Sequence, residues 1–148
     1  MIRHLHFDLV GGIAGDMSVA ALVDAGADFA ELRRRLLASG LPLTEVALRR
    51  EWRGGMAGAL FTVEPERQAP SRHWRDLRPM LAGCALSDRA RGLAIEIFGR
   101  LAQAEAEVHG CSPDEVHFHE VGAMDSIADI VGAAVAIDLL DATSFSCS

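Results

Sequence analysis

The sequence is short of positive charge. Lys and Arg number 14 against 21 Asp and Glu, so the 148-residue chain has a formal net charge of −7. This balance disfavours a nucleic-acid or anionic-membrane partner, because both bind basic surfaces. Cysteine is also scarce: three residues, with no CxxC pair, favour a reduced cytoplasmic protein over a disulfide scaffold.

Targeting and nucleotide-binding signals are missing as well. The first residues are charged and too weakly apolar for a secretory signal. The most apolar segment, "IADIVGAAVAIDLLDA", is interrupted by Asp129 and Asp138, which excludes a membrane span. The stretch "DLVGGIAGDM" has its glycines in the order G-G-x-x-G and lacks a following Lys-Ser/Thr. It is therefore neither the dinucleotide fingerprint nor a P-loop.

Length and patterning predict one domain. Half of the residues are apolar and about a quarter are charged, which is typical of a globular chain with a core. We expect strands at 3–10, 45–52 and 58–65, a short extended piece at 116–119, and helices at 16–26, 29–39, 73–83, 88–109 and 125–140. The predicted class is α+β: a helix-rich single domain with a small sheet that includes an antiparallel hairpin. The end, "TSFSCS", lies where a further strand could begin, and we expect it to be cut rather than finished.

The long helix carries a regular apolar pattern. Its large residues recur every three or four positions and are predicted to face the core: Leu93, Ile97, Leu101, Ala104 and Val108. Ser87 is the predicted N-cap, and Gly110 the predicted end.

The densest polar stretch is "EVHFHEVGAMDSIADI", residues 115–130. Five ionisable side chains fall within 13 residues: His117, His119, Glu120, Asp125 and Asp129. An extended backbone would point the two histidines the same way. Imidazoles with carboxylates suit Zn, Mn, Fe, Co or Ni; alternatively, His119 and Glu120 could act as acid and base. A polar loop followed by a helix cap is the structural alternative, but this density favours a functional site.

Two other stretches could contribute. Asp8 and the glycine turn at 11–15 precede a predicted helix start, where free N–H groups attract anions; Asp16 is either a helix cap or a ligand-binding residue. Further along, Arg72 and His73 form a local positive point suited to phosphate or carboxylate, or else a solvated helix start.

A second histidine pair lies in the first strand. His4 and His6 share one strand face, open either to metal or to solvent. For His4 the solvent-exposed interpretation is favoured.

In combination, these stretches closely resemble the nickel-insertion family called LarC. The matching segments, in family order, are "FDLVGGIAGDMSVAALVDAG", "RHWRDL", "IFGRLAQAEAEVHG" and "EVHFHEVGAMDSIADIVGAAVAIDLL". The chain departs from the family pattern at Leu9, Ser71 and Met124; Ser71 replaces a histidine that usually precedes the Arg-His pair.

The resemblance implies a nickel chelatase of the lyase class. Family members insert nickel into pyridinium-3,5-bisthiocarboxylic acid mononucleotide, with CTP and Mn²⁺ or Mg²⁺. The chain resembles the N-terminal domain, so its expected partners are the mononucleotide, the C-terminal nucleotide-associated region or a second chain, and copies of itself. The alternatives are a non-catalytic nickel-binding or scaffolding module and a metal-dependent phosphohydrolase.

Carried onto this sequence, the resemblance assigns residues to three roles. The metal ligands would be His117, His119, Glu120 and Asp125, and Glu120 or His119 would be the catalytic base. The residues that bind the mononucleotide would be Asp8, Gly11, Gly12, Gly15, Asp16, Arg72 and His73.

Overall fold

The computed structural model describes residues 3–66, 72–119 and 121–148. In chain order, its elements are β1 (His4–Phe7), α1 (Gly15–Asp24), α2 (Phe29–Ala38), β2 (Leu43–Arg53), β3 (Met56–Pro65), α3 (Trp74–Ala82), α4 (Asp88–His109), the short 3-10 helix η1 (Pro113–Glu115), α5 (Met124–Leu139) and β4 (Ser144–Cys147). The predicted α+β class is confirmed, and each predicted helix lies within two residues of its observed bounds.

Local signals explain where the helices begin and end. The Asp28 side chain accepts a hydrogen bond from the Glu31 backbone N–H at the start of α2. Ser87 likewise caps α4 through the Ala90 N–H. Gly110 ends α4 in the left-handed region, with φ at 65°, a conformation that glycine adopts without steric cost.

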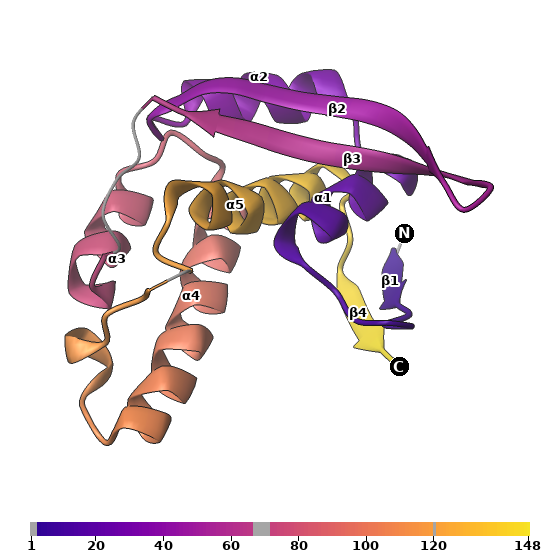
Figure 1. Cartoon of the computed structure of the whole chain (residues 1–148). Helices are drawn as coiled ribbons and strands as arrows, with labels where there is room; N and C mark the ends of the chain where they lie inside the picture. Colours follow the sequence, from indigo (N-terminus) through magenta and orange to yellow (C-terminus); the bar gives the residue numbers. More distant parts are fainter. Residues whose placement is uncertain (1–2, 67–71, 120) are drawn as a thin grey trace.

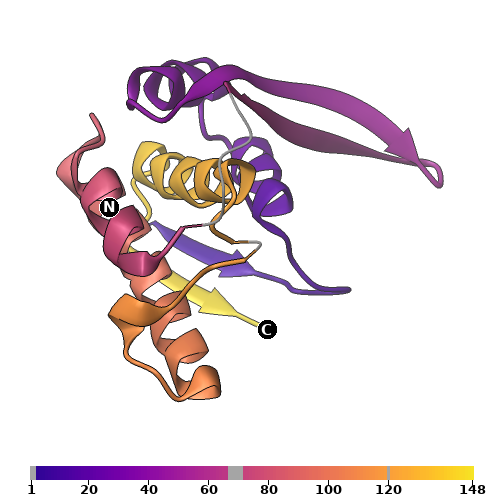
Figure 2. The same ribbon diagram turned by 60° about the vertical axis from the view of Figure 1, so that its left-hand side comes forward.

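The strands form two separate pairs (Figure 1). β2 and β3 are antiparallel and turn through Gly54 and Gly55, which confirms the predicted hairpin. β1 and β4 are parallel, with His4 opposite Ser144 and Phe7 opposite Cys147. In both views the hairpin tip extends beyond the helices, whereas β1 and β4 lie on the other side of α5 (Figure 2).

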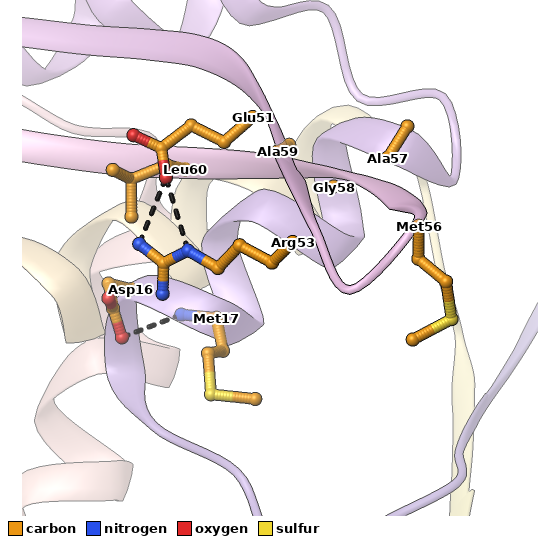
Figure 3. Close-up of a pocket in the computed structure, with 9 residues that line it drawn as sticks. All are labelled: Asp16, Met17, Glu51, Arg53, Met56, Ala57, Gly58, Ala59 and Leu60. Carbon is orange, nitrogen blue, oxygen red and sulfur yellow. Dashed lines mark hydrogen bonds and ion pairs between the residues drawn. The ribbon is translucent and has the colours of Figure 1, made fainter.

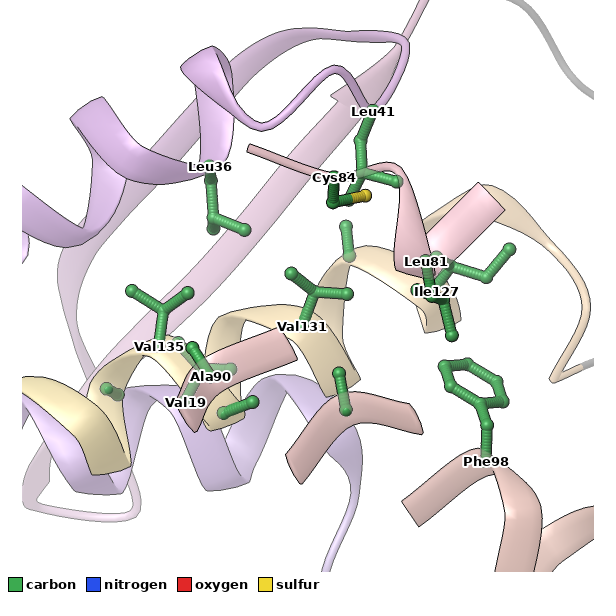
Figure 4. Packing of buried hydrophobic residues seen from close by; sticks show 14 of the residues in the cluster. Val19, Leu36, Leu41, Leu81, Cys84, Ala90, Phe98, Ile127, Val131 and Val135 are labelled. Carbon is green, nitrogen blue, oxygen red and sulfur yellow. The ribbon is translucent and has the colours of Figure 1, made fainter. Parts of the chain in front are cut away.

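Helix α5 is the centre of the core. It packs against α1, α2, α4 and β3, and nine of its residues are buried. Figure 4 shows Ile127, Val131 and Val135 of this helix among side chains from several other elements. The apolar pattern of α5 is therefore that of a core helix. Within the described ranges, no helix is long and apolar enough to cross a bilayer.

The predicted core face of α4 is wrong by about one residue. Val108 is 80 % exposed and Ala104 is exposed, while Leu93, Ile97 and Leu101 are only partly buried. The buried positions are Ala90, Ala94, Phe98, Ala102 and Ala106. Four of these five are alanines, whose small side chains let α4 pack closely against α5. The larger apolar residues flank this line.

Candidate functional site

The histidine stretch has an alternating orientation. Val116 and Phe118 are buried, whereas His117 and His119 are exposed, as expected for an extended backbone. The ring of Phe118 packs against Phe98 of α4, with centroids 6.0 Å apart. Burial of Phe118 therefore fixes the side on which both histidines lie.

A third histidine joins them from the start of α3. His73 and His117 form an isolated antiparallel bridge. The Phe118 N–H donates to the Arg72 carbonyl at 3.0 Å, and the Trp74 N–H donates to the Val116 carbonyl at 3.1 Å. The centroids of the His73 and His117 rings lie 4.7 Å apart, edge to face.

The row of imidazoles continues to His119. Its ring centroid lies 4.9 Å from that of His117, again edge to face. The three rings are in contact, but the described residues contain no ready-made group of three metal-ligating side chains. Glu120 lies outside the described residues.

Two polar side-chain atoms beside this row are buried. In the part of the chain that the structure describes, these atoms, His73 Nδ1 and Arg72 Nη1, have no hydrogen-bond partner. Both residues are half-buried. Buried polar atoms without partners are uncommon in folded proteins, and their explanations include a bound ion or water and a catalytic role. The two atoms therefore mark this end of the row as a candidate binding site.

Gly122 allows this arrangement to reach α5. A Cβ at this position would lie 2.7 Å from the Phe118 carbonyl oxygen and 2.8 Å from the Arg72 backbone nitrogen. Only glycine permits the chain to pass so close to the paired segments. Two residues later, α5 begins.

Two carboxylates occupy equivalent places at helix starts. Asp16 is the second residue of α1 and Asp125 the second of α5. In each, Oδ1 accepts the backbone N–H of the next residue at 2.8 Å. The residues before these helices, Ala14 and Ala123, provide no side-chain cap. A carboxylate in the first turn also interacts favourably with the helix dipole.

Asp129 connects the two helix starts. Burial raises the pKa of its carboxyl from 3.8 to about 7, and the charges of Asp16 and Asp125 add to the rise. A hydrogen bond from the Asp16 backbone N–H opposes this rise. The sequence prediction included Asp129 in the polar stretch but gave it no role in the site. The feature that could have indicated a role is a charged residue inside an otherwise apolar helix.

A pocket opens beside Asp16, between α1 and the hairpin. Its volume is about 500 Å³, and it lies between the start of α1 and the β2–β3 hairpin. Asp16 and Met17 form one wall, and Glu51, Arg53 and residues 56–60 form the other. Figure 3 shows the Arg53 guanidinium between the carboxylates of Glu51 and Asp16. No local pattern predicted this pocket, because its two walls are far apart in the chain.

Asp8 and the first glycines lie at the end of β1. Asp8 accepts a hydrogen bond from the Ser148 hydroxyl at 3.3 Å. Gly11 and Gly12 adopt φ of 83° and 96°, as their predicted turn requires. No described contact joins Asp8 to the histidine row.

His4 and His6 of β1 are both exposed, as predicted for His4, and their rings form hydrogen bonds with serines of β4. His4 lies 2.9 Å from the Ser144 hydroxyl and 2.8 Å from the Ser146 hydroxyl. His6 also contacts Ser146, at 2.8 Å.

Comparison with known proteins places the chain in a family. The family model described as "Nickel insertion protein" matches residues 5–148. A Nocardioides protein named pyridinium-3,5-bisthiocarboxylic acid mononucleotide nickel insertion protein is 45 % identical over 141 residues, 95 % of this chain. A protein from Geotalea daltonii, whose name assigns it to nickel insertion, is 48 % identical over 94 % of this chain.

The match covers only part of these relatives. The chain spans 36 % of the length of each. No solved structure matches. Because the family model covers nearly all of the sequence, this chain belongs to the nickel insertion protein family.

Proposed function

We propose that this chain handles metal and substrate for the insertion of nickel into pyridinium-3,5-bisthiocarboxylic acid mononucleotide. Family membership supports the nickel chemistry, and the name of the Nocardioides relative supplies the substrate. The chain spans 36 % of the length of these relatives. Because its motifs resemble those of the family's N-terminal domain, we assign it the role of that domain. The CTP-dependent step is assigned to the remaining region, as is binding of the Mn²⁺ or Mg²⁺ that accompanies CTP.

The proposed nickel ligands are centred on the histidine row. His117, His119 and Glu120 bind the ion, and Asp125 completes or orients the set. Two observations carry this proposal: the buried Nδ1 of His73 has no hydrogen-bond partner among the described residues, and the His73 ring lies against that of His117. We therefore add His73 as a ligand. Neutral imidazole and carboxylate together are suitable donors for nickel.

Metal binding requires a modest rearrangement. The rings now meet edge to face, so their nitrogens have to turn toward a common point. His117 and His119 are exposed and have room to rotate, whereas the Phe118 backbone between them is held by its hydrogen bond to Arg72. Rotation of these two side chains therefore does not require movement of the core.

The mononucleotide is assigned to the adjacent helix starts. Gly11, Gly12 and Gly15, together with Arg72, bind the phosphate, with Asp8 and Asp16 beside them. Arg72 offers a buried Nη1 that has no described partner. Guanidinium pairs strongly with phosphate because its N–H donors match the anion's oxygens.

Formation of a carbon–nickel bond releases a proton from the ring carbon. Glu120 or His119 is the proposed acceptor, because both belong to the proposed ligand segment. Proton acceptance by a positioned side chain is a standard contribution to catalysis.

Calorimetric titration with nickel tests the metal assignment. The double variant His117→Ala/His119→Ala is compared with His4→Ala/His6→Ala, in which two exposed histidines at the same spacing are removed. We expect nickel affinity to fall at least tenfold in the first variant and to stay within twofold in the second. Equal affinity in wild type and the His117/His119 variant, with folding intact by circular dichroism, would remove the proposal.

A further inference from the structure

We propose that the pocket between α1 and the β2–β3 hairpin binds the ring of the pyridinium mononucleotide, and that Arg53 pairs with one of the ring's acid groups. This inference rests on the proposed function for the chemistry of the ligand. The ring would then bind at a place separate from the glycine turn at 11–15 that is proposed to bind the phosphate.

The pocket has the size and lining that a flat ring needs. Its volume of about 500 Å³ falls in the range typical of small-molecule sites. Met17 on α1 and Met56 on β3 line it and are 54 % and 75 % exposed. A thioether is polarisable and contacts aromatic rings favourably. Exposed methionines on two walls of one pocket are therefore suited to enclose a ring.

Arg53 is available to an acid group. Its Nε and Nη2 donate to Glu51 at 3.2 and 2.9 Å, and among the described residues Nη1 has no partner. Glu51 is shared, because Arg49 Nε also contacts it at 3.1 Å. Arg49 does not line the pocket, but because it shares Glu51 the charge of Arg53 is less fully neutralised. The fork of an arginine matches the geometry of a carboxylate or thiocarboxylate.

The opposite wall carries the opposite charge. Asp16 lines the pocket from α1 and faces the Arg53 side, as Figure 3 shows. A pyridinium ring with acid substituents has the same polarity, with a positive nitrogen in the ring and negative groups at its edge. Placing the ring nitrogen toward Asp16 and an acid group toward Arg53 satisfies both walls.

Two nucleotides that differ at a single group provide the probe. Nicotinic acid mononucleotide carries a ring carboxylate, and nicotinamide mononucleotide carries an amide in its place; ring, ribose and phosphate are shared. Binding of each to the 148-residue chain is measured by calorimetry. Variants are Arg53→Ala and, as the control, Arg100→Ala on α4, whose side chain is also 80 % exposed and also paired with one glutamate.

The expected pattern is selective. Arg53→Ala weakens binding of the acid roughly tenfold, the loss expected for one charge-assisted hydrogen bond, and changes binding of the amide less than about twofold. Arg100→Ala changes neither. If Arg53→Ala weakens both nucleotides equally, Arg53 contacts the phosphate and the assignment is wrong. Unchanged binding of both, or no binding to wild type, also overturns it.

A second pair of variants tests whether the ring binds in this pocket. Met17→Ala/Met56→Ala should weaken both nucleotides about three- to tenfold, since both share the ring. Trp52→Ala is the control: Trp52 is 74 % exposed on β2 beside Arg53 but does not line the pocket. Equal effects of the two variants would contradict the assignment. Nickel titration of the wild-type chain separates this inference from the proposed function: if that chain binds the nucleotides but not nickel, the metal site alone is rejected.

Discussion

Asp129 of α5 lies directly against Gly15 of α1. A Cβ built on Gly15 would lie 2.7 Å from the Asp129 Cβ and 2.9 Å from its Oδ2. The carboxyl accepts the backbone N–H of Asp16, so α5 supplies the cap that Ala14 does not provide for α1. The last glycine of the "GGIAG" turn is thus required for contact between two helices rather than for a left-handed conformation.

Adding a methyl group at this contact should destabilise the fold. Gly15→Ala is expected to lower the free energy of unfolding by about 1–3 kcal/mol, because the Asp129 Cβ is fixed by its helix and cannot move aside. Gly92→Ala is the control. Its Cβ would meet nothing within 4 Å inside α4, so a gain of roughly 0.5–1 kcal/mol is expected. Urea denaturation measures both; a stabilised Gly15→Ala variant would contradict the contact.

Neutralising Asp129 should change the pH dependence of stability. Its pKa of about 7 in the folded chain lies above the value near 3.9 of an unfolded aspartate. The folded state therefore binds more protons between about pH 4 and 7, and stability falls as the pH rises through this window. Asp129→Asn should remove that loss, raising Tm at pH 8 by roughly 2–4 °C for about 1 kcal/mol, with little change at pH 4.

The measurement is a series of thermal melts with a chelator present. Asp114→Asn, an exposed aspartate of η1, serves as the control and should leave the profile unchanged. Parallel profiles for wild type and Asp129→Asn would show that ionisation of Asp129 does not oppose folding.

Substitution of Gly122 should separate the histidine row. In Gly122→Ala the new methyl would meet two backbone atoms, the Phe118 oxygen and the Arg72 nitrogen, so the His73–His117 bridge must open. We expect a loss of about 1–3 kcal/mol in stability and roughly tenfold weaker nickel binding. Gly83→Ala, with ordinary contacts at 3.5 and 3.6 Å, should leave nickel affinity unchanged.

Nickel should raise the melting temperature, and this effect should depend on pH. A ligand at about 100 times its Kd stabilises the folded state by about 2.7 kcal/mol, which corresponds to roughly 5–10 °C here. Imidazoles must be deprotonated to bind metal, so the rise in Tm should shrink as the pH falls from about 8 to 5.5. A rise that is the same at every pH would point to carboxylate ligands instead of histidines.

Local patterns were sufficient to predict most elements. The Ser87 cap and the Gly110 end of α4 depend only on neighbouring residues, so the bounds of this helix were predicted correctly. The buried face of α4 was not, because the choice between two adjacent apolar stripes depends on how closely α5 approaches. The predicted stripe contained the large apolar residues, whereas the stripe that is buried consists mainly of alanines.

The site was predicted to a similar extent. Sequence spacing indicated that His117 and His119 share a face, and their exposure confirms it. Contact of His73 with His117 depends on pairing between segments that are distant in the chain, which no local pattern contains. The same applies to the contact between Gly15 and Asp129. The metal and mononucleotide assignments remain predictions.

The parallel pairing of β1 and β4 has a consequence for the order of folding. Its partners, such as His4 and Ser144, are 140 residues apart in the chain. Contacts at such separation carry a large loop-closure cost and form late unless the intervening chain is already compact. The hairpin and α5 can therefore assemble first. The turn that leads from β1 into α1 would then be fixed last, so that the mononucleotide site proposed there would form only once the whole domain has folded.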